Sequence, residues 1–249
     1  MKSYHLLVIL FLSSCSYPDS FDFKVNHFGA LKNLMHKGDL SSKVALSDLV
    51  NVENLYALGA VENLKGEVLI LDSKPMISSV EYAKEEVVIL DTVFNEEFRV
   101  VTIDNSFEKN ACLLVYASVK EWEAIAIPNT HLSYEEFEVF VESKAKELGV
   151  NTEEPFPFLI EGIVDSFDWH VIDWPEGDTE HSHDKHIHSG LYGTLKNQAV
   201  EMLGFYSNKH HAIFTHHTTN MHVHVKSDKA IGHADDFVLG ENMILKLPK

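Results

Sequence analysis

The chain has 249 residues, which is enough for one large domain or two modest lobes. Its hydrophobic content of 45% supports a real core and excludes a disordered protein. A formal net charge of −18, from 38 acidic and 20 basic residues, repels phosphate backbones. We therefore expect no nucleic-acid partner. Arg99 is the single arginine in the chain.

The first 15 residues have the pattern of an export signal. Lys2 supplies a positive start, residues 6–12 form an apolar run too short to span a bilayer, and two serines precede Cys15. Residues 12–15 resemble the lipobox of bacterial lipoproteins, in which the cysteine is lipidated. The alternative is an ordinary signal peptide with an incidental cysteine.

This pattern predicts a signal peptide over 1–15 and a tether over 16–23. It predicts an exported lipoprotein in the periplasm or at the cell surface, with membrane contact only through a lipid on Cys15. A lipidated Cys15 leaves Cys112 alone, which excludes a disulfide framework. Cys112 lies in an apolar run and is expected to be a buried small hydrophobe.

The first half of the chain predicts two short helices and a series of strands. Apolar spacing over 28–35 favours a helix that ends at Gly38, and a second short helix is expected over 46–50. Apolar runs predict strands over 67–71, 87–90, 100–103, 113–119 and 124–127.

A strongly marked amphipathic helix follows. Ser133 and Glu136 form a capping box, and Gly149 ends the apolar face that comes after them. We interpret this helix as the connection between two β-rich lobes. Beyond it, strands are predicted over 158–164, 169–172, 200–205, 212–215 and 243–247, and around His222 and His233.

The predicted fold class is α/β in the α+β sense, with mixed or antiparallel sheets. The expected organisation is a first lobe over about 24–131, a connecting helix over about 133–149 and a metal-binding lobe over about 155–249.

Histidine is concentrated in the second lobe, where 12 of the 16 lie between His170 and His233. The biased segment 180–188 can bind metal weakly or form a solvated loop, and we favour the loop. The pairs at 210–211 and 216–217 flank the predicted strand 212–215. One ring of each pair is expected to approach the site.

The most informative pattern joins His222, His224 and His233. Side chains at i and i+2 of a strand share one face, so His222 and His224 project together. The polar stretch 226–229 predicts a turn, and a hairpin return brings His233 beside them. Three imidazoles on one face are the ligand set of an open zinc site. The alternative is three exposed histidines on a polar face.

The order of these motifs resembles the α-acetolactate decarboxylases, a family of zinc-dependent lyases. The likeness extends from about residue 24 to 247. It rests on His36-Lys-Gly-Asp39, Tyr56-Ala-Leu-Gly59, Asn63-Leu-Lys-Gly-Glu67, Phe156-Pro-Phe-Leu-Ile-Glu-Gly162, Leu203-Gly-Phe205, His222-Val-His224 and Gly232-His-Ala-Asp-Asp-Phe237.

The resemblance implies two α/β lobes, one zinc ion per chain held by His222, His224 and His233, and Glu67 as a proton-transfer group. It also implies a small oxyacid as substrate and a homodimer. Three departures stand against it. Leu159 occupies the position of the family's active-site arginine, the chain ends near the start of the family's glutamate-bearing tail, and the turn before His233 is shorter.

The sequence therefore leaves three functions open. The first is a zinc-dependent decarboxylase of acetolactate-like 2-hydroxy-3-oxo acids, which gives acetoin-like products. The second is a divergent metal-dependent lyase or hydrolase on another oxyacid, which the missing arginine favours. The third is a non-catalytic, His-rich metal-binding lipoprotein. Protonated His216 or His217 are candidate substitutes for the arginine.

Overall fold

The computed structural model describes residues 23–89 and 92–249, with side chains outside 84–97. The predicted signal peptide, the lipobox at Cys15 and nearly all of the tether lie outside the described residues. Within the described ranges, no helix has both the length and the apolar character needed to cross a membrane.

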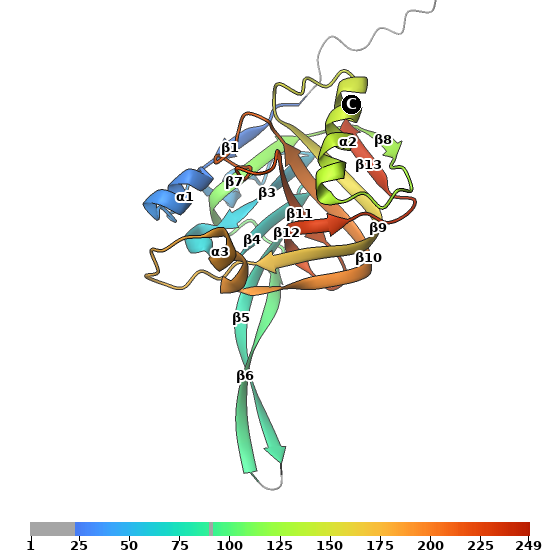
Figure 1. The fold of residues 1–249 in the computed structure, drawn as a ribbon. Helices are drawn as coiled ribbons and strands as arrows, with labels where there is room; N and C mark the ends of the chain where they lie inside the picture. Colours follow the sequence, from blue (N-terminus) through green and yellow to red (C-terminus); the bar gives the residue numbers. More distant parts are fainter. Residues whose placement is uncertain (1–22, 90–91) are drawn as a thin grey trace, which may run out of the picture.

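The first half of the chain folds into an antiparallel sheet with the strand order β1-β7-β3-β4-β5-β6, in which β2 also pairs with β7 (Figure 1). Its strands are β1 (Asn26–Phe28), β2 (Val44–Ala45), β3 (Leu55–Val61), β4 (Glu67–Leu71), β5 (Lys74–Ile89), β6 (Thr92–Asp104) and β7 (Asn110–Ser118). The long β5–β6 hairpin projects well beyond the body of the molecule (Figure 1).

The second half forms another antiparallel sheet. Its strands are β8 (Trp122–Ala126), β9 (Phe156–Val171), β10 (Leu191–Tyr206), β11 (Met221–Lys226), β12 (Ile231–Val238) and β13 (Ile244–Pro248). The pairings β9–β10, β10–β11, β11–β12 and β12–β9 close on themselves, so these four strands make a small barrel-like unit. The sheet continues beyond this unit, because β13 pairs with residues 159–161 of β9, and β8 pairs with β13.

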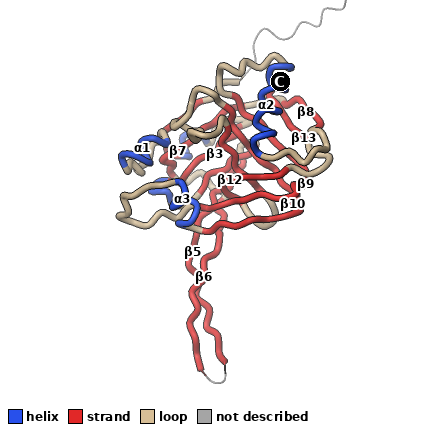
Figure 2. The backbone as a smooth tube through the Cα atoms, viewed as in Figure 1, coloured by secondary structure: helices blue, strands red, loops and turns tan. Residues whose placement is uncertain are grey.

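Three α-helices and two 3-10 turns lie outside the sheets in the described part of the chain (Figure 2). They are α1 (Leu31–Lys37), η1 (Leu46–Leu49), η2 (Glu62–Leu64), α2 (Tyr134–Glu147) and α3 (His183–Ser189). The predicted α+β class with two antiparallel sheets is confirmed.

Helix α2 begins with the predicted capping box, in which Ser133 and Glu136 each bond the other's backbone N–H. Its apolar face, with Phe137 at the centre, packs into the core of the second sheet. Phe137 contacts Phe158 and Phe237 at ring-centroid distances of 5.7 Å each. The helix therefore covers the second sheet and does not merely connect two lobes.

Some predicted boundaries differ from the structure. β8 pairs with β13, so residues 122–126, which were expected in the first lobe, belong to the second sheet. The two strands expected over 158–164 and 169–172 are the continuous strand β9. β3 was not predicted, and Gly59 lies within it. A Cβ at Gly59 would come within 2.1 Å of the Leu113 carbonyl oxygen of β7.

The strand expected over 212–215 is wrong. Ile213 and Phe214 both donate their backbone N–H groups to the His210 carbonyl, and Ala212 has a left-handed φ of 59°. These features make a turn. The prediction failed because a short apolar run does not by itself distinguish a strand from a buried turn.

The two sheets pack face to face through an apolar interface. β4 is buried on both sides, and Leu69 and Leu71 point toward the second sheet. They meet Leu159, Leu203 and Phe205, which project outward from the barrel-like unit. Alternate residues of the same strands, such as Phe158 and Met202, point into the other core. This interface positions the site.

Candidate metal centre

The β11–β12 hairpin brings the three predicted histidines together. His224 and His233 are direct partners across the two strands, and His222 lies two residues along β11. The hairpin turn is closed by the Ser227 N–H, which donates to the Ala230 carbonyl at 2.8 Å. Gly232 allows β12 to approach β9 here, because a Cβ would lie 2.3 Å from the His170 carbonyl oxygen.

All three imidazoles face the first sheet, on the same side as Leu203 and Phe205 of the neighbouring strand β10. The Nε2 atoms of His222 and His224 are 3.2 Å apart. One ligand nitrogen from each of the three rings fits within a mutual distance of 4.8 Å. The structure thus places a compact set of three nitrogens at the interface between the sheets.

This cluster is strongly desolvated. His224 is fully buried and His222 is 5% exposed. Burial lowers the pKa of all three histidines, and for His222 and His224 the neighbouring imidazoles lower it further. Each ring is therefore neutral near pH 7, which is the form that binds a metal ion. The Nδ1 atoms of all three are buried without a hydrogen-bond partner in this structure.

Glu67 reaches this cluster from the first sheet. It begins β4 and points in the same direction as Leu69 and Leu71. Its Oε2 lies 3.7 Å from His224 Nε2, and its Oε1 accepts a hydrogen bond of 3.3 Å from the Ile172 N–H. Burial raises the pKa of Glu67 well above its usual value, and the nearby charge of Asp235 adds to this.

His170 and Asp235 complete the group, and sequence reasoning did not assign either of them a role. His170, on β9, is the cross-strand partner of His233, and its Nε2 lies 3.7 Å from Glu67 Oε1. Asp235 accepts a hydrogen bond of 2.8 Å from His170 Nδ1. The signal for Asp235 was its spacing of two residues from His233. The signal for His170 was its place in a predicted strand.

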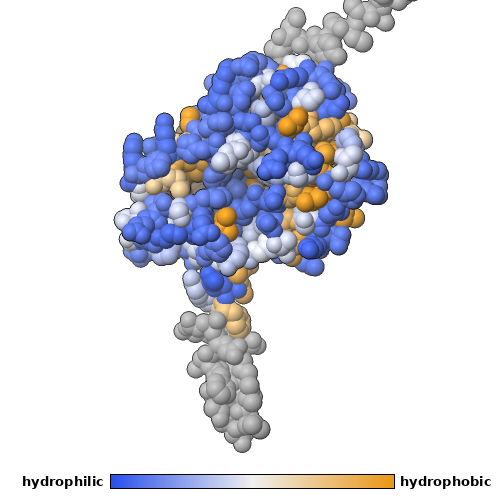
Figure 3. All heavy atoms as spheres, in the orientation of Figure 1, coloured by the Kyte–Doolittle hydropathy of each residue, from blue (hydrophilic) through white to orange (hydrophobic). Residues whose placement is uncertain are grey.

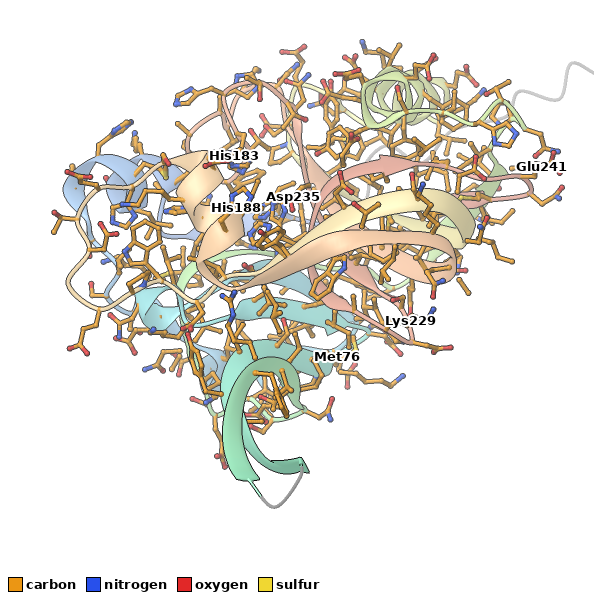
Figure 4. The ribbon with its side chains drawn as sticks, turned by 60° about the horizontal axis from the view of Figure 1, so that its bottom comes forward. Met76, His183, His188, Lys229, Asp235 and Glu241 are labelled. Carbon is orange, nitrogen blue, oxygen red and sulfur yellow. The ribbon has the colours of Figure 1, made fainter. Side chains whose placement is uncertain are left out.

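Asp235 is ionised within this buried group. Burial alone would raise its pKa, but the hydrogen bond from His170 and the adjacent His233 ring lower the pKa below its usual range. Figure 4 shows Asp235 in the interior, beside the helix α3 that carries His183 and His188.

A small cavity of about 50 Å³ lies against the imidazoles. Its apolar wall comes from both halves of the chain and includes Leu34, Ala60 and Ile172, whereas the polar wall holds Glu67 and histidines. This volume accommodates a few waters, since each needs roughly 10–15 Å³ of such space. Two wider cavities of about 580 and 270 Å³ lie outside it, and His183 and His216 line all three.

The interpretation of 180–188 as a solvated loop is wrong. Residues 183–189 form α3, whose N-cap Ser182 accepts a hydrogen bond from the Lys185 N–H. His181 stacks on Trp174 at 4.4 Å between ring centroids, and His186 meets the same indole edge-on. Aromatic packing therefore folds the segment onto the protein.

Of the 216–217 pair, His216 approaches the site and His217 is exposed. The His216 ring centroid lies 6.1 Å from that of His233. Burial, followed by the adjacent His233 and His183, lowers the pKa of His216 to about 3. The expectation that a protonated His216 replaces the arginine is therefore wrong, because the ring is neutral in the physiological range.

No lysine or arginine lines the cavity against the imidazoles, among the residues that the structure describes. Arg99 instead donates to the Gly190 carbonyl at 2.7 Å, just after α3. Leu159 is 3% exposed within the interface between the sheets. Leu203 on β10 pairs with Leu159 on β9 and with His224 on β11. Leu159 and His224 therefore lie two strands apart on the same face of the sheet.

Solved structures share this architecture. The acetolactate decarboxylase from Bacillus subtilis subspecies spizizenii matches with a TM-score of 0.66 and 14% identity, over 90% of this chain and 86% of that chain. The chain has the α-acetolactate decarboxylase fold. The enzyme from Bacillus subtilis strain 168 matches with a TM-score of 0.65 and 14% identity, over 90% and 85% of the chains.

A protein of unknown function from Staphylococcus aureus, described as similar to α-acetolactate decarboxylase, also shares the fold. It matches with a TM-score of 0.64 and 13% identity, over 89% of this chain and 84% of that chain. Neither a protein-family model nor a curated protein matches the sequence. At this level of identity the likeness to the decarboxylases is one of fold.

The residues of this acetolactate decarboxylase fold fit a metal ion. Three neutral imidazoles with converging nitrogens are typical ligands for a divalent ion that keeps an open position. The Nε2 atoms of His222 and His224 face each other at 3.2 Å in a buried position, and a bound cation would offset the cost of burying these polar atoms. His222, His224 and His233 thus form a buried group that can hold a metal.

We expect His224→Ala to remove most of the bound metal, because the fully buried His224 contributes a nitrogen at the centre of the group. The measurement is metal content per chain after dialysis, with exposed His217→Ala as the control. Unchanged metal content in His224→Ala would refute the three-histidine assignment.

The metal-free protein should lose stability as the pH falls below about 6.5, the ordinary histidine pKa. Histidines of the unfolded chain take up protons there, while the buried rings, with pKa values of about 4 for His186 and about 3 for His216, stay neutral. The unfolded state then binds more protons, so stability rises with pH over this range. Glu67 has the opposite effect, because its raised pKa makes the folded state take up a proton on acidification, but it is one group against several histidines.

The measurement is the urea midpoint between pH 7.5 and 5. A midpoint that stays constant or rises on acidification would contradict the burial of these histidines.

Proposed function

We propose that the protein is a zinc-dependent decarboxylase of acetolactate-like 2-hydroxy-3-oxo acids, with acetoin-like products. The observation that carries the proposal is the approach of Glu67 to within 3.7 Å of His224, across the interface between the two sheets. A carboxyl group beside a three-histidine group, in this fold, supplies both a metal site and a proton-transfer group.

When bound by His222, His224 and His233, zinc would act as a Lewis acid that stabilises negative charge on substrate oxygens. Loss of CO2 leaves an electron pair on the carbon that carried the carboxylate. Glu67 is the carboxyl group placed to deliver a proton to that carbon, and its burial favours the protonated form. The apolar wall, with Leu34 and Ala60, suits short alkyl groups.

A second candidate is a metal-dependent lyase or hydrolase that acts on another oxyacid. The observation that favours it is the absence of a lysine or arginine among the described residues that line the inner cavity. A carboxylate substrate would lack the bidentate partner that arginine provides. Losing one such interaction costs about 2–4 kcal/mol of transition-state stabilisation, which corresponds to roughly 10²–10³-fold in rate.

The third function, a metal buffer without catalysis, needs several weak sites. The described residues contain one compact three-histidine group and a second group that shares His233 with it. One tightly bound ion per chain therefore supports an enzyme, whereas several weak ions would support a buffer.

The decisive experiment is turnover of racemic acetolactate by the zinc-loaded full chain in mild detergent. We expect acetoin from the parent protein and a loss of about 10²–10⁴-fold in Glu67→Gln, with zinc retained. Glu147→Gln, on the exposed side of α2, is the matched control. If the parent protein and Glu67→Gln both bind one zinc ion and make no acetoin, the proposed substrate changes to another oxyacid. Full turnover by Glu67→Gln would remove Glu67 from the mechanism.

We also propose that the protein is exported and anchored through a lipid on Cys15, on the basis of the lipobox-like sequence. Cys15→Ser should abolish incorporation of a labelled fatty acid in a bacterial host, and Cys112→Ser, at a buried thiol, is the control. Label that persists in Cys15→Ser would refute the anchor.

A further inference from the structure

We propose that Asp235, together with His170, is a positioning residue that fixes the ring of His233 for metal binding. This inference rests on the proposed metal centre and extends it to residues outside the three ligands. The contacts that support it join the adjacent strands β9 and β12 to β4 of the opposite sheet.

A β-bulge in β12 places Asp235 at the site. Ala234 pairs with Trp169 and Asp236 pairs with Asp168, so Asp235 is the extra residue between them. The bulge resets the alternation of the strand, because Ala234 and Phe237 both pack into the core of the second sheet although they are three residues apart. Asp235 is thereby free to turn toward the imidazoles.

One carboxylate contacts two imidazoles. Asp235 Oδ2 lies 2.8 Å and Oδ1 lies 3.0 Å from His170 Nδ1. Asp235 Oδ1 is also 3.3 Å from His233 Nδ1. The rings of His170 and His233 stack at 4.9 Å between centroids, with 28° between their planes. The carboxylate thus lies against the Nδ1 edge of both rings.

This arrangement selects the tautomer of His233. A carboxylate accepts hydrogen bonds only, so it favours a proton on Nδ1 and leaves the Nε2 lone pair for the metal. Carboxylate–histidine–metal chains of this type orient the ligand ring and raise its basicity. His222 and His224 have no carboxylate beside Nδ1 in the described structure, so His233 depends most on such a partner.

His170 extends the chain to the other sheet. Its Nδ1 donates to Asp235, and its Nε2 faces Glu67 Oε1 at 3.7 Å. With its side chain 7% exposed, His170 is packed between the two carboxyl groups. Asp235 therefore connects the orientation of a metal ligand with the position of the proton-transfer group.

The same residues can be viewed as a second cation site, because His170, His233 and Asp235 have ligand atoms within 4.8 Å of one another. The hydrogen-bond distance argues for positioning. Two ligands on one tetrahedral zinc ion, each bonded at about 2.0–2.1 Å, stand roughly 3.3 Å apart. The 2.8 Å between Asp235 Oδ2 and His170 Nδ1 is shorter and fits a hydrogen bond. The 3.3 Å between Asp235 Oδ1 and His233 Nδ1 fits both arrangements, so the zinc stoichiometry separates them.

The test measures zinc affinity of the full chain in mild detergent, by competition with a chelating dye. We expect Asp235→Asn to weaken zinc binding by about 10–100-fold, the usual cost of losing such a partner. Asp168→Asn is the matched control, because this exposed aspartate contacts Thr194 and no imidazole. We expect its affinity to equal that of the parent.

His170→Asn provides a second variant, since the asparagine amide stands where His170 Nδ1 donates to Asp235, and we expect a smaller loss of affinity. ¹⁵N NMR of the zinc-loaded protein adds a readout that a merely structural role would not move. The parent should show His233 protonated at Nδ1, and Asp235→Asn should shift or broaden that signal. The urea midpoints of the metal-free parent and variants show how much of any loss of affinity comes from reduced folding.

Zinc affinity unchanged in Asp235→Asn would overturn the inference. So would a stoichiometry of two zinc ions that falls to one in this variant, because Asp235 would then be a ligand. Failure of the proposed function is distinguishable, since it shows as absent acetoin with zinc affinity intact. A parent protein that binds no zinc would overturn both.

Discussion

Apolar packing of two β-sheets against each other buries three histidines and a glutamate between them. Taking imidazole and carboxyl groups out of water is unfavourable unless they gain partners. The interface that encloses them is apolar, with residues such as Leu69, Leu203 and Phe205 around the polar group. Hydrophobic contact between the sheets therefore stabilises a site that would be unfavourable by itself.

The strand pairings decide which atoms meet inside this interface. β9, β12 and β11 are adjacent and antiparallel, so His170, His233 and His224 form a row across three strands. Glu67 comes from the opposite sheet and faces that row. Relative movement of the two sheets would separate the carboxyl group from the nitrogens, which makes the packing between the sheets a functional constraint as well as a structural one.

The segments on either side of α3 are bonded to the first sheet by two side chains. Arg99, on β6, donates to the Gly190 carbonyl, and Tyr82, on β5, donates to Asp173 at 3.2 Å. Together they attach the base of the long hairpin to the segments around α3. The surface of this face is largely hydrophilic, with scattered apolar spots (Figure 3), in keeping with the acidic composition. An anionic substrate would approach against this charge, so the metal ion would have to invert the field locally.

Elements whose signals are local could be predicted from the amino-acid sequence alone. Alternation of side chains along a strand predicted that His222 and His224 share a face, and the polar turn predicted the return to His233. The capping box predicted where α2 begins. The apolar runs predicted most strands, although 212–215 proved to be a turn, since a short apolar run does not specify its own backbone geometry.

Tertiary structure decided everything that depends on contacts between distant residues. The assignment of β8 to the second sheet required its pairing with β13, more than 100 residues later. The placement of α3 depends on Trp174, which packs against His181 just before the helix and against His186 within it. The roles of His170 and Asp235 depend on strand register and on one inserted residue in β12. Sequence periodicity predicts the face on which a side chain lies, but packing alone determines what it meets there.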